Sequence, residues 1–420
     1  MDLIEKIKNG NPLGKTSLAA LVNGYLNGAV SKEEMTAFLR AVCRYGLSDE
    51  DAAALTAVML ESGETLSFKH RAYPYADKHS TGGVADSTTL IVAPIVAAAG
   101  IPFLKMSGRK LGHTGGTIDK LECFRGLKTE LSVVEAERIV DKVGAAVIAQ
   151  SKELVPADKA LYELRDETDT VKSLSLIASS VVSKKLASGA EVLVLDVKTG
   201  AGAFMEEVSE GEKLARLMIK ILLGAGKKAA AFLTDMNSPL GEGVGGVMEV
   251  IDAIEVLEGK QSNLRTLALL LAAKIISLAK SISDEEGMAE ATRLIEQGEA
   301  LAKLKEIIAT QGGSLALFDK GERARMLSKK AGTVFAEKSG YIRKIDCVAL
   351  GNAARKFESE GGYGMTVPFK VGARVEKRMP LVTLYGEKPA PNELMDALSA
   401  CFILSDKVMN ANPLVYEIIT

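Results

Sequence analysis

EVLVLDVKTG, residues 191–200, is a short apolar run that ends in a glycine turn. Helical patterns separate it from similar runs, which are IPFLKMSG (101–108), AAVIAQ (145–150) and KKAAAFLTDM (227–236). Short strands that alternate with helices predict a mostly parallel sheet with helices on its faces. We therefore expect a large α/β domain formed by residues 70–155 and 190–329.

Three other regions follow different patterns. Residues 1–64 are predicted to be helical, because apolar residues such as Leu18 and Leu21 recur at spacings of three and four. A second helical stretch, residues 156–189, interrupts the α/β pattern, and we expect it to join the first as a small discontinuous all-α domain. Residues 330–420 are rich in strand patterns joined by glycine and proline turns, and they predict a C-terminal α+β lobe.

The composition excludes several classes of protein. The 420 residues are 47% hydrophobic and 25% charged, which is ordinary globular usage, and this length predicts two to three domains at about 150 residues each. Lys and Arg total 52 against 54 for Asp and Glu, a net charge of −2, so nucleic acid is not an expected partner. No apolar stretch reaches the roughly 18 to 20 residues of a membrane span. The N-terminus lacks the pattern of a secretory signal, and the four cysteines form no CxxC pair, so we expect a cytoplasmic protein.

The segment DKHSTGGVADSTTL, residues 77–90, is the first candidate for binding an anion. Its glycines let backbone N–H groups converge, its hydroxyls can donate, and a helix with a partially positive end is predicted to follow. Lys78 adds a full charge, and two of the three histidines, His79 and His113, lie in this segment and the next. It is neither a Walker A loop nor a GxGxxG loop. From the residues alone, phosphate binding and a structural glycine-rich turn stay equally open.

Two later segments also concentrate polar side chains. KMSGRKLGHTGGTIDKLE, residues 105–122, combines glycines and hydroxyls with Arg109, which again suits phosphate. In YELRDETDTVKSLSLIASSVVSKK, residues 162–185, helical spacing places Ser180 and Lys184 on one face. That face is either a binding surface or an ordinary solvated helix. Neither a metal-ligand pattern nor a GxSxG elbow occurs in the sequence.

These segments resemble the thymidine and pyrimidine-nucleoside phosphorylases, the class II nucleoside phosphorylases. The resemblance rests on DKHSTGGV, SGRKLGHTGGTIDKLE, PADKALYELRD with SLIASSVVSKK, and DVKTGAGAF. It covers most of the chain, more loosely in the C-terminal lobe. It implies reversible phosphorolysis, in which a pyrimidine nucleoside and inorganic phosphate give the free base and a pentose 1-phosphate. Phosphate is then a co-substrate, and no organic cofactor is implied.

The resemblance also implies roles for individual residues. The residues that match the family's phosphate ligands are Lys78, Ser80, Thr89, Ser107 and Thr117. Those that match its base contacts are Arg165, Ser180 and Lys184, with His79 and Tyr162 near the nucleoside and a base wall of Leu111, Val171, Ile177 and Phe204. The catalytic residues so implied are His79, Arg165 and Lys184. In some members a monovalent cation, commonly potassium, lies beside the phosphate loop, at positions that match Ala85, Ser87, Leu240, Gly243 and Asp252.

The implied roles are chemically consistent. Phosphate is itself the nucleophile at the anomeric carbon, so the protein has to position it and needs no covalent residue. Negative charge grows on the departing pyrimidine as the glycosidic bond stretches. Cations such as Arg165 and Lys184 stabilise that charge more in the transition state than in the ground state. Phosphate on one domain and nucleoside on the other would require domain closure.

Several residues depart from the usual family pattern. Ala85 replaces a glycine of the phosphate loop, which bears on the cation site, and other usual residues are replaced by Lys110, Asp169, Lys172 and Ser175. Lys110 and Asp169 lie close in sequence to base-wall residues. One hypothesis is that they form an ion pair and leave the substrate unchanged. The other, which we favour, is that they contact a polar group that thymidine lacks, so that a ribonucleoside or modified pyrimidine nucleoside is preferred. Lys105 followed by methionine also favours the broad pyrimidine type.

Two functions other than nucleoside phosphorolysis are alternatives for this sequence. The anthranilate phosphoribosyltransferases resemble this fold, but they need magnesium and a diphosphate site, and their GTGGD-type loop is absent from this sequence. A non-catalytic nucleoside-sensing homologue is the second alternative, and retention of Lys78 and Lys184 argues against it. The resemblance also predicts a homodimer formed through the N-terminal helices, where Leu18, Leu21 and Tyr25 make an apolar stripe, unless that stripe packs internally.

Overall fold

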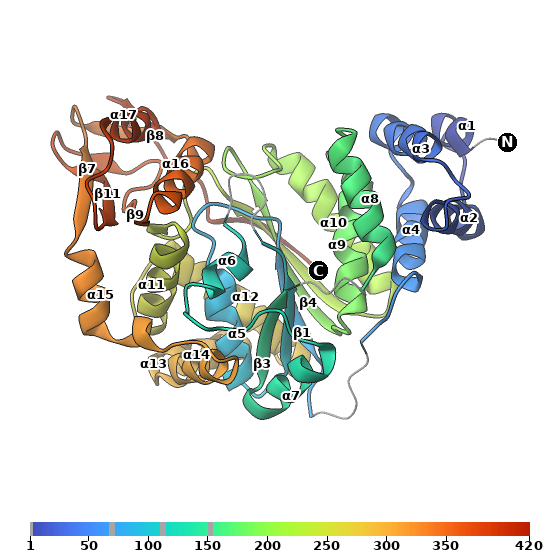
Figure 1. Cartoon of the computed structure of the whole chain (residues 1–420), viewed down its shortest axis with the longest axis horizontal. Helices are drawn as coiled ribbons and strands as arrows, with labels where there is room; N and C mark the ends of the chain where they lie inside the picture. The colour runs from blue at the N-terminus through green and yellow to red at the C-terminus, as the bar shows by residue number, and fades with distance from the viewer. Residues whose placement is uncertain (1–2, 67–71, 110–114, 150–153) are drawn as a thin grey trace.

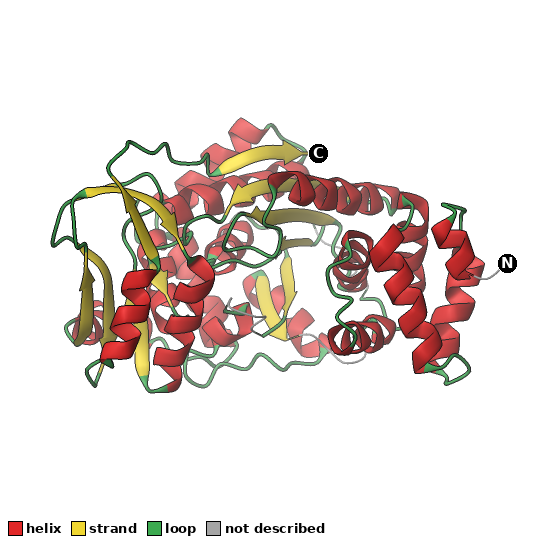
Figure 2. Ribbon diagram, turned by 90° about the horizontal axis from the view of Figure 1, so that it is seen from above, coloured by secondary structure: helices red, strands yellow, loops and turns green. Residues whose placement is uncertain are grey.

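The computed structural model describes residues 3–66, 72–109, 115–149 and 154–420. Figure 1 shows an α/β part in the centre, with the N-terminal helices on one side and the C-terminal lobe on the other. Figure 2 shows that the end of the molecule beside the N-terminus is built of helices alone. Within these ranges, no helix is long and apolar enough to cross a membrane. The predicted fold class is confirmed.

Six helices make up the helical part, four from the N-terminal segment and two from later in the chain. Their bounds are α1 (Leu3–Lys8), α2 (Lys15–Leu26), α3 (Lys32–Tyr45), α4 (Asp49–Glu61), α8 (Pro156–Glu167) and α9 (Leu174–Ala187). Leu18 and Leu39 share one buried apolar cluster with Leu161 of α8. Of the apolar stripe on α2, Leu18 is fully buried in this cluster, whereas Leu21 and Tyr25 are half-buried.

A six-stranded sheet is the centre of the α/β part. Its order is β13-β5-β4-β1-β2-β3, and every neighbouring pair is parallel except β13 with β5. The strands are β1 (Ala76–Ser80), β2 (Phe103–Ser107), β3 (Ala145–Ala149), β4 (Val192–Thr199), β5 (Lys228–Asp235) and β13 (Val415–Ile419). The helices of this part are α5 (Thr88–Ala98), α6 (Thr117–Leu121), α7 (Val133–Val143), α10 (Val208–Gly224), α11 (Gly246–Leu257), α12 (Asn263–Lys280), α13 (Asp284–Glu296) and α14 (Glu299–Thr310).

Helices bury both faces of β4, which explains the apolar run Val192–Leu195 at its start. Val192 and Val194 pack in the apolar cluster that contains α5 and α12. Leu193 and Leu195 pack in the cluster that contains α9 and α10. A strand covered on both faces has no solvent side, so its sequence shows no alternation of apolar and polar residues.

The C-terminal lobe is the predicted α+β structure. Its elements are η1 (Ala316–Phe318), α15 (Lys320–Leu327), β7 (Lys330–Phe335), β8 (Gly340–Ile345), α16 (Cys347–Ser359), β9 (Gly362–Thr366), β10 (Arg374–Val375), β11 (Pro380–Gly386), α17 (Asn392–Ala400) and β12 (Phe402–Ser405). Its sheets have the orders β10-β8-β12 and β6-β9-β11-β7, where β6 (Gly243–Val244) comes from the α/β part. The boundaries differ from the expected ones at both ends, because η1 and α15 come before residue 330 and β13 leaves the lobe and pairs with β5. Its Ile419 is buried there, and the strand covers an edge that would otherwise be open.

Candidate active site

The predicted phosphate residues gather at the carboxyl edge of the central sheet. Strands β1, β2 and β4 are parallel, so the ends of β1 at Ser80 and of β2 at Ser107 lie at the same edge. Thr89 is buried in the first turn of α5, and Thr117 begins α6. The carboxyl edge of an open α/β sheet is where such folds bind their ligands.

Lys78 belongs to a buried network of four charges. Its Nζ donates to Thr88 Oγ1 at 2.6 Å and lies 3.6 Å from Asp196 Oδ2 and 3.9 Å from Asp86 Oδ2. Lys198 Nζ is 2.7 Å from Asp196 Oδ2 and 3.7 Å from Asp86 Oδ2. The two ammonium groups and two carboxylates balance, as buried charges must.

Asp86 is the carboxylate that orients the predicted phosphate donors. It accepts a hydrogen bond of 2.6 Å from the Ser80 hydroxyl and lies beside Lys78. Burial alone would raise the pKa of Asp86, but Lys198, Lys78 and Lys120 hold it well below its ordinary value. Burial lowers the pKa of Lys78, and Asp86 opposes that shift. Asp86 is therefore ionised and fixes both donors.

The opposite face of β1 carries Asp77 and His79, because successive side chains of a strand alternate. Asp77 Oδ2 lies 2.7 Å from Lys185 Nζ of α9, which ties the helical part to the sheet. His79 is half-buried. Burial, and then Lys185, Lys105 and other nearby lysines, lower the pKa of His79 well below its ordinary value. Its imidazole is therefore neutral at pH 7.

Helices α8 and α9 bring a second group of predicted residues together. Lys184 Nζ lies 2.7 Å from Asp158 Oδ2 and donates to Ser180 Oγ at 2.9 Å. The Tyr162 ring centroid lies 6.0 Å from Lys184 Nζ and 6.0 Å from the guanidinium carbon of Arg165. Asp158 is almost completely buried. Its other oxygen, Oδ1, has no hydrogen-bond partner within the described ranges.

Arg165 holds the loop between α8 and α9. Its guanidinium donates to three main-chain carbonyls, those of Thr170 at 3.3 Å, Leu176 at 3.2 Å and Val171 at 2.8 Å. It is buried, and burial lowers its pKa. Three of its five N–H donors thus bind main-chain carbonyls at and around Val171, a predicted base-wall residue.

The remaining base-wall residues differ in their surroundings. Val171 is half-buried in the loop between α8 and α9, Ile177 is half-buried in the first turn of α9, and Phe204 is exposed in the loop between β4 and α10. Leu111 lies outside the described residues, as does the neighbouring Lys110. Asp169, the other introduced charge, is exposed and has a left-handed backbone with φ of 53°.

Sequence reasoning missed the residues that hold the site, including the carboxylates of Asp77, Asp86 and Asp196 described above. Lys105 is buried in β2 and donates to the Lys78 carbonyl at 2.6 Å, and burial together with Lys185 lowers its pKa to about 7. Lys185, Lys198 and Asp158 form the ion pairs described above. The sequence carries one signal for such residues, which is a lysine inside an apolar strand, as in VLVLDVK. A charge buried in this way needs a partner of opposite charge.

The positions that match a potassium site do not fit that ion. Asp252, their one charged member, has Oδ1 2.9 Å from Lys260 Nζ, and its Oδ2 accepts from the N–H groups of Glu242 and Gly243. The Ala85 carbonyl accepts from another backbone N–H, at 3.1 Å. Within the described ranges the buried Ser87 hydroxyl has no hydrogen-bond partner, but a hard cation needs several oxygen ligands. Nor do three or more His, Cys, Asp or Glu residues gather in the described part of the chain to hold a metal ion.

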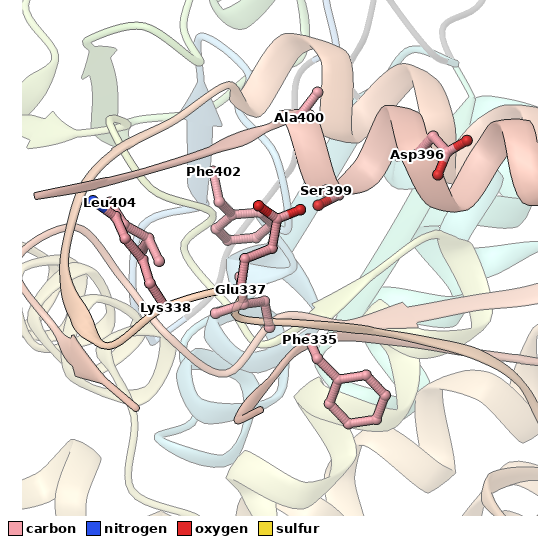
Figure 3. A pocket seen from close by; sticks show the side chains of 9 residues that line it. Phe335, Glu337, Lys338, Asp396, Ser399, Ala400, Phe402 and Leu404 are labelled. Carbon is pink, nitrogen blue, oxygen red and sulfur yellow. The ribbon is translucent and has the colours of Figure 1, made fainter. Parts of the chain in front are cut away.

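A cavity of about 640 Å³ lies elsewhere, in the C-terminal lobe. Figure 3 shows Glu337, Ser399 and Phe402 around it, with Phe335 and Asp396 farther out. None of the predicted site residues lines it. It mixes apolar and charged side chains and is separate from the carboxyl edge of the central sheet.

The chain is similar to known proteins in sequence and in fold. The helical bundle domain of the glycosyl transferase family matches residues 1–63, and the a/b domain of that family matches residues 72–301. A pyrimidine-nucleoside phosphorylase of Bacillus subtilis (strain 168) is 40% identical over 407 residues, 94% of each chain. One of Geobacillus stearothermophilus is 38% identical over 428 residues, 99% of each chain. The crystal structure of anthranilate phosphoribosyltransferase from Thermus thermophilus aligns with a TM-score of 0.61 at 20% identity, covering 74% of this chain and 100% of that one. This last likeness shows the fold alone.

Proposed function

The chain belongs to the pyrimidine-nucleoside phosphorylases of the glycosyl transferase family, and we propose that it catalyses the reversible phosphorolysis of pyrimidine nucleosides. Inorganic phosphate and the nucleoside give the free base and a pentose 1-phosphate. One observation carries the proposal. The end of β1, with Lys78 and Ser80, is tied directly to α9, the helix of Lys184 and Ser180, through the ion pair of Asp77 with Lys185.

Phosphate is held by Lys78, Ser80, Thr89, Ser107 and Thr117 in this proposal. Asp86 fixes Lys78 and Ser80, so the donors are oriented before phosphate arrives. Phosphate then attacks the anomeric carbon directly, and orientation of the two reactants supplies much of the rate.

The departing base is stabilised from the α8–α9 side. Lys184 is a cation held by Asp158 and Ser180, and its charge faces the negative charge that develops on the pyrimidine. Arg165 orders the loop that carries Val171 and offers its remaining N–H donors to the base. The neutral His79, on the face of β1 opposite Lys78, can form a hydrogen bond to the nucleoside without adding charge.

The preferred substrate is a ribonucleoside or a modified pyrimidine nucleoside instead of thymidine. Asp169 and Lys172 are exposed on the loop between α8 and α9, beside the base-wall residue Val171. An exposed ion pair of Asp169 with Lys110 would contribute only about 0 to 1 kcal/mol. That small value favours a role for these charges in contacting the substrate.

We further propose a cytoplasmic homodimer. The half-buried Leu21 and Tyr25 on α2 support a contact between N-terminal helices, although Leu18 of the same stripe packs internally. The division into residues 1–64 with 156–189, 70–155 with 190–329, and 330–420 is the basis for closure of the helical domain over phosphate. Sedimentation at micromolar concentration measures the dimer directly, and a monomer would contradict it.

The test is phosphate-dependent release of uracil, thymine or cytosine from a panel of thymidine, uridine, 2′-deoxyuridine and cytidine. We expect release that requires orthophosphate, with thymidine not the best substrate. Dependence on magnesium and phosphoribosyl diphosphate would identify a phosphoribosyltransferase instead. Binding of nucleosides without any release would identify a sensing protein. Thymidine as the best substrate by a wide margin, with Lys110→Gly leaving the ranking intact, would contradict the proposed specificity.

A further inference from the structure

A buried carboxylate lies behind the phosphate loop, where it needs a positive partner. Asp252 of α11 is 2% exposed. Its Oδ2 accepts from the N–H groups of Glu242 at 2.8 Å and Gly243 at 3.2 Å. These bonds orient the carboxylate but leave its charge uncompensated, and a buried charge without a counterion is costly.

Lys260, which follows α11, supplies that charge. Its Nζ lies 2.9 Å from Asp252 Oδ1, 2.9 Å from Glu242 Oε2 and 3.2 Å from Glu255 Oε2. Burial alone would lower the pKa of Lys260, but Asp252 and Glu242 raise it above its ordinary value. The side chain therefore carries a full charge at any neutral pH and bridges three carboxylates.

Asp252, paired with Lys260, binds the segment that contains Glu242 and Gly243. The backbone of this segment supports the phosphate loop. The N–H of Leu240 donates to the Val84 carbonyl at 3.1 Å, and the N–H of Gly241 donates to the Ala85 carbonyl at 3.1 Å. Ala85 has a left-handed backbone with φ of 58°, a conformation that a non-glycine residue keeps only when its surroundings hold it. The next residue, Asp86, fixes the phosphate donors.

We propose that the Lys260 ammonium replaces a bound monovalent cation as the positive charge behind the phosphate loop, so that this enzyme needs no potassium. The Asp252 carboxylate already has a cationic partner, the Lys260 ammonium group. A potassium ion on Asp252 would share it with an ammonium group already 2.9 Å from Oδ1, and the two cations would repel each other. The proposal goes beyond phosphorolysis itself, because it concerns what holds the loop in place.

The experiment compares potassium chloride with tetramethylammonium chloride at equal ionic strength. Two quantities are measured, the Tm of the free protein and kcat/KM for phosphate. We expect the wild-type protein to give the same values in both salts. In tetramethylammonium, Lys260→Met lowers the Tm and loses about tenfold or more in kcat/KM for phosphate, because one partner of a buried pair is missing. Potassium restores both values in that variant.

The matched control is Lys213→Met, which makes the same change at an exposed lysine on α10. It should behave like the wild type in both salts. A wild-type Tm or rate that rises with potassium would overturn the proposal, and so would a Lys260→Met variant that matches the control. If Lys260→Met does not fold, the double variant Asp252→Asn with Lys260→Met removes both charges. That protein should show no response to potassium, and a response would again overturn the proposal. The Tm does not depend on catalysis, so this result is separate from the test of phosphorolysis.

Discussion

Lys78 is buried between the carboxylates of Asp86 and Asp196, at the point where strand β1 approaches the first turn of α5. Its neighbour His79 points to the opposite face, toward the lysines of α9. The alternation of a strand thus places Lys78, which we propose for phosphate, and the neutral imidazole of His79, which we propose for the nucleoside, on opposite faces. In the proposed function, two adjacent residues serve two reactants.

Lys78→Ala should weaken the use of phosphate far more than the binding of nucleoside. A charge-assisted contact is worth about 1.5 to 3 kcal/mol, so we expect KM for phosphate to rise at least about tenfold. Initial rates over a range of phosphate at saturating nucleoside measure this. Lys213→Ala, on the exposed face of α10, is the control, and an unchanged KM for phosphate would contradict the assignment of Lys78.

Asp158→Asn should act on the nucleoside instead. The asparagine keeps the shape of Asp158 but removes the charge that holds Lys184, so the ammonium is no longer fixed against the base. We expect kcat/KM for the nucleoside to fall about tenfold or more, since one side of a largely buried ion pair is lost, while KM for phosphate stays the same. Asp166→Asn, on the exposed face of the same helix, is the control. Equal losses in both variants would mean that the helix, and not Lys184, is affected.

The sequence predicted residues in motifs dense with polar side chains, but not the residues that hold them. Lys78 stands among glycines, hydroxyls and charges, and Lys184 stands among hydroxyls and charges, so the signal is local. Lys198 and Lys105 stand inside apolar strands. Lys198 pairs with Asp196 of its own strand and with Asp86 of the loop after β1, and Lys105 donates to the Lys78 carbonyl of β1. The contacts with Asp86 and with β1 are visible only once the order of the sheet is known. The same holds for Arg165, whose bonds to three main-chain carbonyls depend on the path of a loop.

At the scale of the element, α10 shows how closely the helices approach the sheet. A Cβ atom added at Gly211 would lie 2.2 Å from Thr199 Cγ2 of β4 and 2.9 Å from Leu233 Cδ1 of β5. Glycine is otherwise unfavourable within a helix by about 1 kcal/mol relative to alanine. Close approach of the helix to the strands is therefore the reason for a glycine at this position.

Gly211→Ala should destabilise the protein in spite of the better helix propensity of alanine. Overpacking costs about 1 to 3 kcal/mol, which exceeds the propensity gain. Gly224→Ala, at the end of the same helix and with nothing within 4 Å of the added atom, should be neutral or stabilising. Urea unfolding of the two variants measures the difference. A Gly211→Ala protein as stable as Gly224→Ala would show that α10 can move away from the sheet.

The C-terminal lobe reaches the loop that carries Asp86 through buried polar contacts. Glu358 of α16 accepts the N–H of Gly246 at the start of α11. In the first turn of that helix, Glu249 Oε2 lies 2.8 Å from Lys120 Nζ. Lys120 in turn donates to the Asp86 carbonyl at 2.6 Å. Figure 1 shows α16 and α11 as neighbours on this side of the molecule. The lobe therefore supports the site although it contributes no predicted ligand.

Glu358→Gln should change how stability depends on pH. Burial raises the pKa of Glu358 to about 7 from 4.5. The folded protein thus holds this proton more tightly than the unfolded chain, and the stability it contributes is full below about pH 4.5 and lost as pH rises through about 7. Glutamine keeps an acceptor for Gly246 without titrating, so the Tm of the variant relative to wild type should rise between about pH 5 and pH 8. Glu360→Gln, an exposed neighbour, is the control, and a constant Tm difference would contradict the shift.

Because β13 pairs with β5, the central sheet can form in full only after β13 has been synthesised. Asp235 ends β5 and Val415 begins β13, so the whole C-terminal lobe is synthesised between the two partners. During that time the edge of β5 offers unpaired backbone groups to any other strand, including one from a second nascent chain. Contacts between such distant segments also form slowly. The central sheet is thus most exposed to aggregation during translation, and a chaperone that covers β5 would protect the yield without touching the active site.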